Sequence, residues 1–78
     1  MNILYFASLK ENLKIANEDV ELANGSTVKQ LRELLSDKHG DHYFPENILC
    51  AVNQEMANDS VVIKESDEIA FYPPVTGG

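Results

Sequence analysis

The sequence has one cysteine, no tryptophan and few basic residues. With a single cysteine among 78 residues, Cys50, the chain can form neither an intrachain disulfide nor a cysteine-rich zinc site. Six basic against thirteen acidic residues give a net charge of −7, which disfavours contact with a phosphate backbone. No apolar run approaches the roughly 20 residues that span a bilayer, and the N-terminus has no signal-peptide pattern. We therefore expect one small cytoplasmic domain that binds neither nucleic acid nor membrane.

The clearest helix begins directly after Thr27. Thr27 and Gln30 match a capping box, in which a hydroxyl and a side-chain amide each satisfy a backbone N–H. Gly40 suits the position that closes the helix. The apolar face recurs at helical spacing and consists of Val28, Leu31, Leu34 and Leu35.

Short apolar or alternating runs predict the rest of the fold. We expect strands at 3–7, 19–22, 48–53, 61–63 and 69–72, a helical turn at 8–13 and a turn region at 54–60. One helix over one mixed sheet of about five strands accommodates this order. The first and last strands are the most apolar, so they should lie together at the sheet centre. This arrangement is the β-grasp, an α+β fold, and we expect it to occupy residues 1–72.

Residues 73–78 are expected to form a flexible, extended tail. Pro73 and Pro74 favour a stiff spacer, and six extended residues reach about 20 Å. Gly77 and Gly78 have no Cβ atoms and can enter a narrow channel. The terminal carboxylate becomes an acyl donor only when activated, for example as an acyl-adenylate. The four glycines are too scattered for a phosphate-binding loop, so we expect no bound cofactor and ATP use by a partner enzyme.

Several segments together resemble one known family. They are AVNQ at 51–54, DEIAFYPPVTGG at 67–78, Thr27-Val28 at the helix start, Phe6-Ala7, and the LKE turn at 9–11. The chain resembles the small, sulfur-carrying subunits of molybdopterin synthase, in the ubiquitin-like MoaD/ThiS family. The resemblance covers the whole chain, and the terminal dodecapeptide is its most specific part.

The resemblance implies a mechanism. An E1-like adenylyltransferase activates the Gly78 carboxylate, and sulfur from a persulfide donor replaces AMP to leave a thiocarboxylate. The tail enters the large synthase subunit and donates sulfur to cyclic pyranopterin monophosphate. Two transfers build the dithiolene of molybdopterin. The family also implies a heterotetramer, in which this chain is a non-catalytic co-substrate with no activity alone.

The resemblance further implies partner-binding residues. Phe6 and Tyr72 align with aromatic positions that pack against partner subunits, and Lys10 aligns with a basic position near the activating-enzyme contact. Tyr72 replaces the Phe of many relatives, and Ser66 replaces a common Gly. The tail residues expected in the partner channel are Pro73, Pro74, Val75, Thr76, Gly77 and Gly78.

Other reactive side chains have simpler interpretations. Cys50 lies in an apolar run and is expected to be a buried, inert thiol. His39 and His42 are expected to be solvated, with no metal site. Phe6 and Phe71 are also explained as core strand residues. The acidic residues near the second strand are interpreted as a solvated face: Glu18, Asp19 and Glu21.

Three alternative functions stay open at this point. A sulfur carrier for thiamine or tRNA thiolation shares the fold and the Gly-Gly end. A ubiquitin-like modifier uses the same adenylated glycine but forms an amide with lysine. A plain interaction module has an inert tail, and deleting Gly77 and Gly78 then leaves every activity intact.

Overall fold

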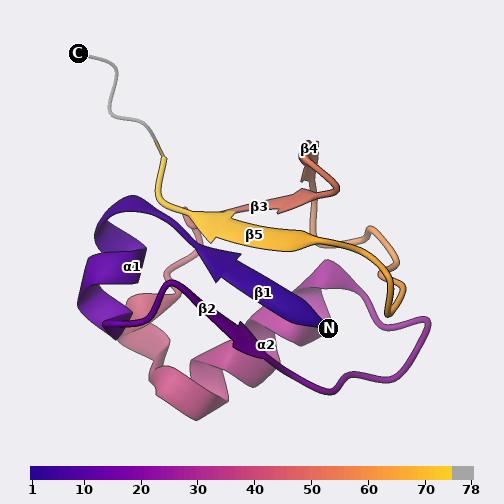
Figure 1. Ribbon diagram of the computed structural model, residues 1–78, viewed down its shortest axis with the longest axis horizontal. Coiled ribbons are helices and arrows are strands. Elements are labelled where there is room, and N and C mark those ends of the chain that lie inside the picture. The colour runs from indigo at the N-terminus through magenta and orange to yellow at the C-terminus, as the bar shows by residue number, and fades with distance from the viewer. Residues whose placement is uncertain (75–78) are drawn as a thin grey trace.

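The computed structural model describes residues 1–74, in which a five-stranded sheet is packed against the longer of two α-helices (Figure 1). The tail residues Val75, Thr76, Gly77 and Gly78 lie outside the described residues. The elements are β1 (Asn2–Tyr5), α1 (Ala7–Leu13), β2 (Asn17–Asp19), α2 (Val28–His39), the 3-10 helix η1 (Asp41–Tyr43), β3 (Leu49–Val52), β4 (Glu55–Ala57) and β5 (Ile69–Tyr72).

The sheet has the order β2-β1-β5-β3-β4. β1 and β5 are parallel neighbours, with Tyr5 opposite Phe71, and the other pairs are antiparallel. The prediction that the first and last strands lie together in the middle of the sheet is therefore confirmed. A mixed sheet of this order with a helix on one face is the β-grasp.

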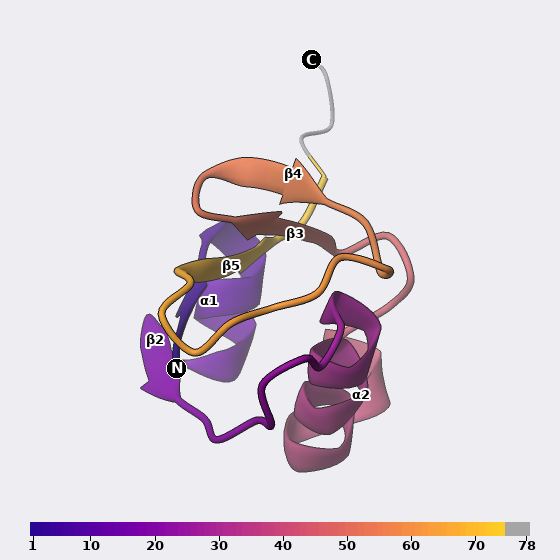
Figure 2. The same cartoon turned by 90° about the vertical axis from the view of Figure 1, so that its right-hand side faces the viewer.

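One face of the sheet forms the core with α2, as Figure 2 shows from the side. Alternate strand residues point to this face, among them Ile3, Ile69 and Phe71, and all three are fully buried. From the helix, Val28, Leu31 and Leu35 are fully buried, whereas the predicted core residue Leu34 is only partly buried.

Both predicted ends of α2 are confirmed. The Gln30 backbone N–H donates to Thr27 Oγ1 (3.3 Å), and the Thr27 N–H donates to Gln30 Oε1 (2.8 Å), which completes the capping box. At the other end, Gly40 has φ +120°, and its N–H donates to the Ser36 carbonyl at 2.8 Å. A Cβ at Gly40 would lie 3.0 Å from the His42 ring, so both φ and space favour glycine.

Three predicted strands differ from the structure. The first strand ends at Tyr5, so Phe6 and Ala7 lie outside it. The second strand spans Asn17–Asp19 instead of 19–22. Its pairing with β1 begins where Asn17 lies opposite Leu4, and the last bond between the two segments is the one that the Val20 N–H donates to the Met1 carbonyl. The run at 61–63 forms only an isolated bridge between Val62 and Thr27. The Ile63 side chain still packs into the core, although the segment does not join the sheet as a strand.

The predicted turn region at 54–60 contains the strand β4. A two-residue turn of Asn53 (φ +52°) and Gln54 (φ +69°) joins β3 to β4. Positive φ at both central residues is the geometry that matches the twist of a hairpin. Asn53 also ties this hairpin to the last loop, since its Nδ2 donates to Asp67 Oδ1 (2.9 Å) and its Oδ1 accepts from the Glu68 N–H (3.0 Å). No helix within residues 1–74 is long and apolar enough to cross a membrane.

Candidate functional site

The end of β5 that leads into the tail lies beside the end of β1. The Phe6 N–H donates to the Phe71 carbonyl at 3.2 Å, which extends the β1–β5 pairing by one bond. Phe71 is fully buried, but Phe6 is 48% exposed and Tyr72 is partly exposed. Pro73 and Pro74 follow directly. The structure thus brings together four predicted partner-binding residues, and it corrects the interpretation of Phe6 as a core residue.

The chain turns sharply between β1 and α1. Phe6 is extended (φ −129°, ψ 158°), whereas Ala7 has φ +55° in the left-handed region. This backbone costs a non-glycine residue about 1–2 kcal/mol. The turn is held on its inner side by Leu9, which is only 2% exposed. Lys10 lies exposed in α1, and its N–H donates to the Phe6 carbonyl at 3.4 Å.

A small hollow on the surface lies beside Pro73 and Pro74. It encloses about 190 Å³ between α1 and the loop that carries η1. Ser8 and Asn12 line it from α1, Tyr43 and Asn47 line it from the loop, and Pro73 and Pro74 form a further wall. The root of the tail therefore borders a hollow that α1 and this loop also line.

The face of the sheet opposite α2 carries apolar side chains. Cross-strand partners share a face, so the register places Leu4, Ala70, Ala51 and Met56 in one row and Tyr72 with Leu49 in the next. Met56 is 73% exposed. We call Leu4, Leu49, Ala51, Met56, Ala70 and Tyr72 the outer sheet face.

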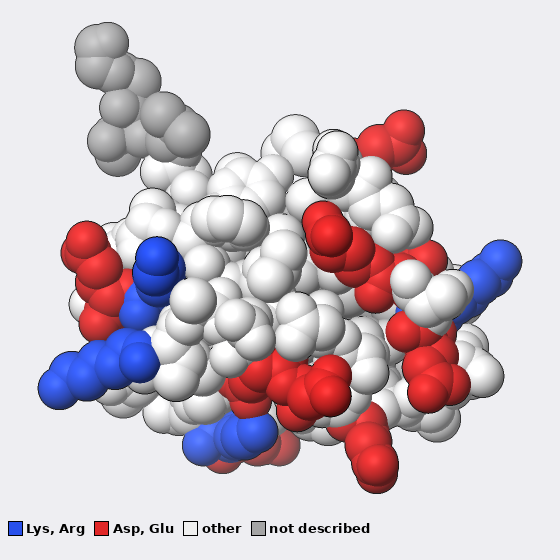
Figure 3. Space-filling view, viewed as in Figure 1, with Lys and Arg blue, Asp and Glu red and all other residues white. Residues whose placement is uncertain are grey.

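The outer sheet face belongs to a wider uncharged area of the surface. Figure 3 shows a continuous area without charged side chains over β1 and β5, with acidic side chains below it and to its right. Sequence reasoning identified only Tyr72 of the outer sheet face. The sequence has no alternation that marks the others, because 49–52 and 69–72 are continuous apolar runs. An exposed apolar surface of this kind is typical of a protein-docking site.

The prediction that Glu18 is solvated is wrong. Its side chain is only 11% exposed. Tyr5 Oη donates to Glu18 Oε2 (2.7 Å), Lys38 Nζ donates to Oε1 (2.5 Å), and His39 Nε2 lies 2.5 Å from Oε2. An ionised carboxylate only accepts, so His39 Nε2 carries the hydrogen in this contact. Glu18 therefore joins β2 to β1 and to the last turn of α2.

The environment of this cluster shifts two pKa values. Burial acts to raise the pKa of Glu18, but hydrogen bonds from Lys38, Tyr5 and His39 outweigh it and hold that pKa below its ordinary value. Burial, followed by the bond to Glu18 and its negative charge, raises the pKa of Tyr5 far above its ordinary value. Tyr5 is thus a neutral hydrogen-bond donor at physiological pH.

The other reactive side chains offer no catalytic arrangement within residues 1–74. Cys50 is 2% exposed, as predicted, and burial raises the pKa of its thiol to about 11, so it is no nucleophile at neutral pH. The exposed His42 stacks on Tyr43 with ring centroids 4.0 Å apart, whereas His39 is partly buried against Glu18, contrary to the prediction of a solvated ring. The described residues contain no group of three His, Cys, Asp or Glu side chains that could hold a metal ion.

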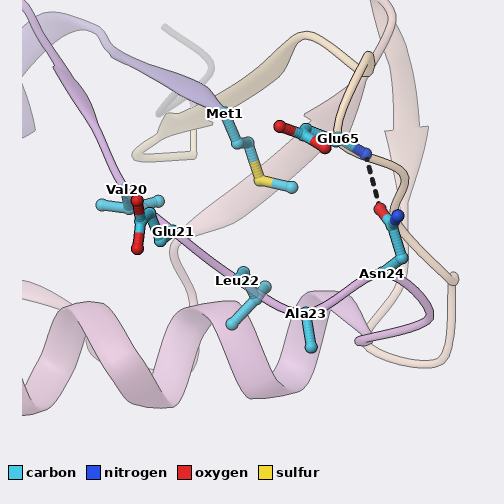
Figure 4. Close-up of a pocket in the computed structure, with 7 residues that line it drawn as sticks. All are labelled: Met1, Val20, Glu21, Leu22, Ala23, Asn24 and Glu65. Carbon is cyan, nitrogen blue, oxygen red and sulfur yellow. Dashed lines mark hydrogen bonds between the residues drawn. The ribbon is translucent and has the colours of Figure 1, made fainter.

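A larger hollow lies at the opposite end of the sheet. It measures about 420 Å³ and is lined by Met1, residues 20–24 and Glu65 (Figure 4). Met1 precedes β1, and β1 runs parallel to β5, so this hollow is at the end of the sheet away from Tyr72. Asn24 Oδ1 accepts from the Glu65 N–H at 3.3 Å along its edge. The hollow has no contact with the root of the tail.

The fold, with Pro73 and Pro74 directly after the central strand β5, defines a ubiquitin-like β-grasp protein. Its structure matches SAMP1, small archaeal modifier protein 1, from Haloferax volcanii with a TM-score of 0.80 and 27% identity, covering 99% of this chain and 97% of that one. It also matches a protein–protein complex of subunits 1 and 2 of molybdopterin-converting factor from Helicobacter pylori, with a TM-score of 0.69 and 28% identity over 99% and 96% of the chains.

The sequence comparison identifies the family. A family model described as the ThiS family matches residues 3–78, and the chain belongs to this family. The molybdopterin synthase sulfur carrier subunit of Mycobacterium tuberculosis is 38% identical to it over 100% of this chain and 96% of that protein. The resemblance seen in the sequence is thereby confirmed.

Proposed function

We propose that this protein is the sulfur carrier of molybdopterin synthesis, with sulfur held as a thiocarboxylate at Gly78. The observation that carries the proposal is the full-length match to the ThiS family and to sulfur carrier subunits. The structure supports it by placing Phe6, Tyr72 and the prolines together where the tail leaves the domain. The lone buried Cys50 fits a reducing cytoplasm, where we place the protein.

The loading chemistry requires a second protein. The Gly78 carboxylate attacks the α-phosphate of ATP and releases pyrophosphate, which gives an acyl-adenylate. The outer sulfur of a persulfide then attacks the acyl carbon, AMP leaves, and a thiol reduces the resulting acyl disulfide to the thiocarboxylate. Since residues 1–74 contain only Gly25 and Gly40, far apart, an E1-like adenylyltransferase must bind the ATP.

Delivery of sulfur requires the large synthase subunit. Phe6 and the outer sheet face dock there, and the tail enters the active site, where the thiocarboxylate transfers sulfur to cyclic pyranopterin monophosphate. The net charge of −7 suits a partner with basic residues around its channel. The Helicobacter pylori complex of two converting-factor subunits supports a docked pair of this kind.

A reconstituted reaction tests this proposal. Wild-type protein and a variant lacking Gly77 and Gly78 are incubated with the adenylyltransferase, ATP, a sulfur donor, the large subunit and the precursor. We expect molybdopterin only with the wild type, while circular dichroism shows both folded and both bind the large subunit. Molybdopterin formation by the truncated chain refutes the proposal.

A docking variant separates this pathway from other sulfur-carrier pathways. Phe6→Ala should weaken binding to the large subunit, whereas Val62→Ala should not. Val62 is a matched control, because it is also apolar and 56% exposed but lies beside the start of α2. If the wild type does not bind the large subunit at all, thiamine or tRNA thiolation becomes the better assignment.

The match to SAMP1 also favours a second candidate, a protein modifier. In that role the adenylated Gly78 would form an amide with lysine side chains of other proteins. Blotting cell lysates for conjugates of higher mass distinguishes the two functions. We expect free protein and no ladder.

A further inference from the structure

We propose that the left-handed backbone at Ala7 is a positioning element that fixes the direction of Phe6 for docking on the large subunit. The inference rests on the proposed function and adds a residue to it. Ala7 makes no contact with the reacting atoms; it acts through Phe6.

Four non-glycine residues within 1–74 have positive φ, and three of them have a local reason. Asn53 and Gln54 form the two-residue hairpin turn between β3 and β4, where the twist requires this geometry. Lys14 closes α1 and donates its N–H to the Lys10 carbonyl, as left-handed residues do at helix ends. Ala7 instead opens a helix, where no such requirement exists.

The surrounding structure holds Ala7 in this conformation. On one side the Phe6 N–H donates to the Phe71 carbonyl (3.2 Å), and on the other the Lys10 N–H donates to the Phe6 carbonyl (3.4 Å). Leu9 anchors the first turn of α1 in the core. Strained backbone that its surroundings enforce is concentrated at functional sites.

The consequence of the turn is the exposure of Phe6. The chain passes from β1 into α1 within one residue, so Phe6 lies at an outer corner, 48% exposed, beside the end of β5. The left-handed well of alanine is narrow, whereas glycine has broad freedom at positive and negative φ. Within the positive-φ region that the surrounding hydrogen bonds impose, alanine allows a narrower range of backbone angles than glycine, which lowers the entropy that Phe6 loses on docking.

Steady-state sulfur transfer tests the inference with carriers that bear a chemically installed C-terminal thiocarboxylate. With purified large subunit and precursor, we expect Ala7→Gly to raise the KM for the carrier about two- to fivefold, from the freedom that glycine adds, and to leave kcat unchanged. Its midpoint of urea unfolding should not fall, because glycine relieves the strained φ. Lys14→Gly is the matched control: it relieves φ +63° at the other end of α1 and should leave KM and kcat unchanged.

A double substitution tests whether Ala7 acts through Phe6. In a Phe6→Ala background, adding Ala7→Gly should change KM no further. The inference is overturned if Ala7→Gly alone leaves KM unchanged, or if its effect persists without the Phe6 ring. If wild-type thiocarboxylate forms no molybdopterin, the proposed function fails as well; if the wild type is active and only the Ala7→Gly result differs, the inference alone fails.

Discussion

Replacing Glu18 by glutamine removes a carboxylate charge that accepts hydrogen bonds from Tyr5 in β1 and from Lys38 and His39 in α2. Glutamine has nearly the same shape, so the change tests hydrogen bonding and charge with little change in packing. Tyr5 Oη and His39 Nε2 both contact Oε2, and Lys38 Nζ contacts Oε1, so the glutamine oxygen can still accept from Tyr5 and His39 while its NH2 group faces Lys38. The Lys38 side chain is 50% exposed, so its pair with Glu18 contributes little.

These contacts set the expected magnitude. A hydrogen bond to a charged group contributes about 1.5–3 kcal/mol and one between neutral groups about 0.5–1.5 kcal/mol, so each of the two retained bonds should weaken by about 1 kcal/mol. With a small contribution from Lys38, we expect Glu18→Gln to lower the free energy of unfolding by about 2 kcal/mol at pH 7. In a domain of this size the melting temperature should fall by roughly 10 °C.

The pH dependence gives an independent check. The pKa of Glu18 is lower in the folded protein than its ordinary value of 4.5, so its contribution is complete above pH 4.5. The contribution is lost as the pH falls through the folded-state pKa. The difference between wild type and Glu18→Gln should therefore shrink in acid.

Urea unfolding followed by circular dichroism at several pH values measures this difference. Glu33→Gln, an exposed change of the same kind in α2, serves as the control and should have an effect below about 0.5 kcal/mol. A loss below about 0.5 kcal/mol for Glu18→Gln at pH 7, or a difference that stays constant into acid, refutes the reasoning.

Three further predictions concern the rest of the domain. Thr27→Ala removes the hydroxyl that caps α2 and should cost about 1 kcal/mol in urea unfolding, whereas Thr27→Ser should cost less. Gln54→Gly relieves φ +69° in the hairpin turn and should raise the free energy of unfolding by about 0.5 kcal/mol; destabilisation would contradict the assigned turn. Cys50 should react with iodoacetamide at pH 8 only after unfolding, since burial raises its thiol pKa to about 11; rapid labelling of the native protein would contradict this.

The sequence predicts best those features that depend on neighbouring residues. The capping box of Thr27 and Gln30 and the closing Gly40 lie within the helix they delimit, so both ends of α2 were predictable. The central pairing of β1 and β5 followed from their apolar content. The aromatic pair of exposed Phe6 and partly exposed Tyr72 was half predicted: the resemblance indicated both as partner-binding, while the apolar run suggested that Phe6 is buried.

Features without a signal in the neighbouring sequence were missed. Asn53-Gln54 lacks the glycine that marks most two-residue hairpins, so β4 was interpreted as part of a turn. Glu18 looked solvated because its three donors come from residues 13 to 21 positions away in the sequence. The left-handed Ala7 has no signal in composition, since alanine rarely adopts that conformation.

The most direct test of the central claim is the chemical state of Gly78. The purified protein is incubated with an E1-like enzyme, ATP and a sulfur donor, and its C-terminal fragments are analysed by mass spectrometry. Fragmentation must localise the change, because oxidation of Met1, Met56 or Cys50 alters the intact mass in a similar way. A sulfur carrier should show one oxygen of Gly78 replaced by sulfur. A plain carboxylate at Gly78 after this treatment contradicts the account.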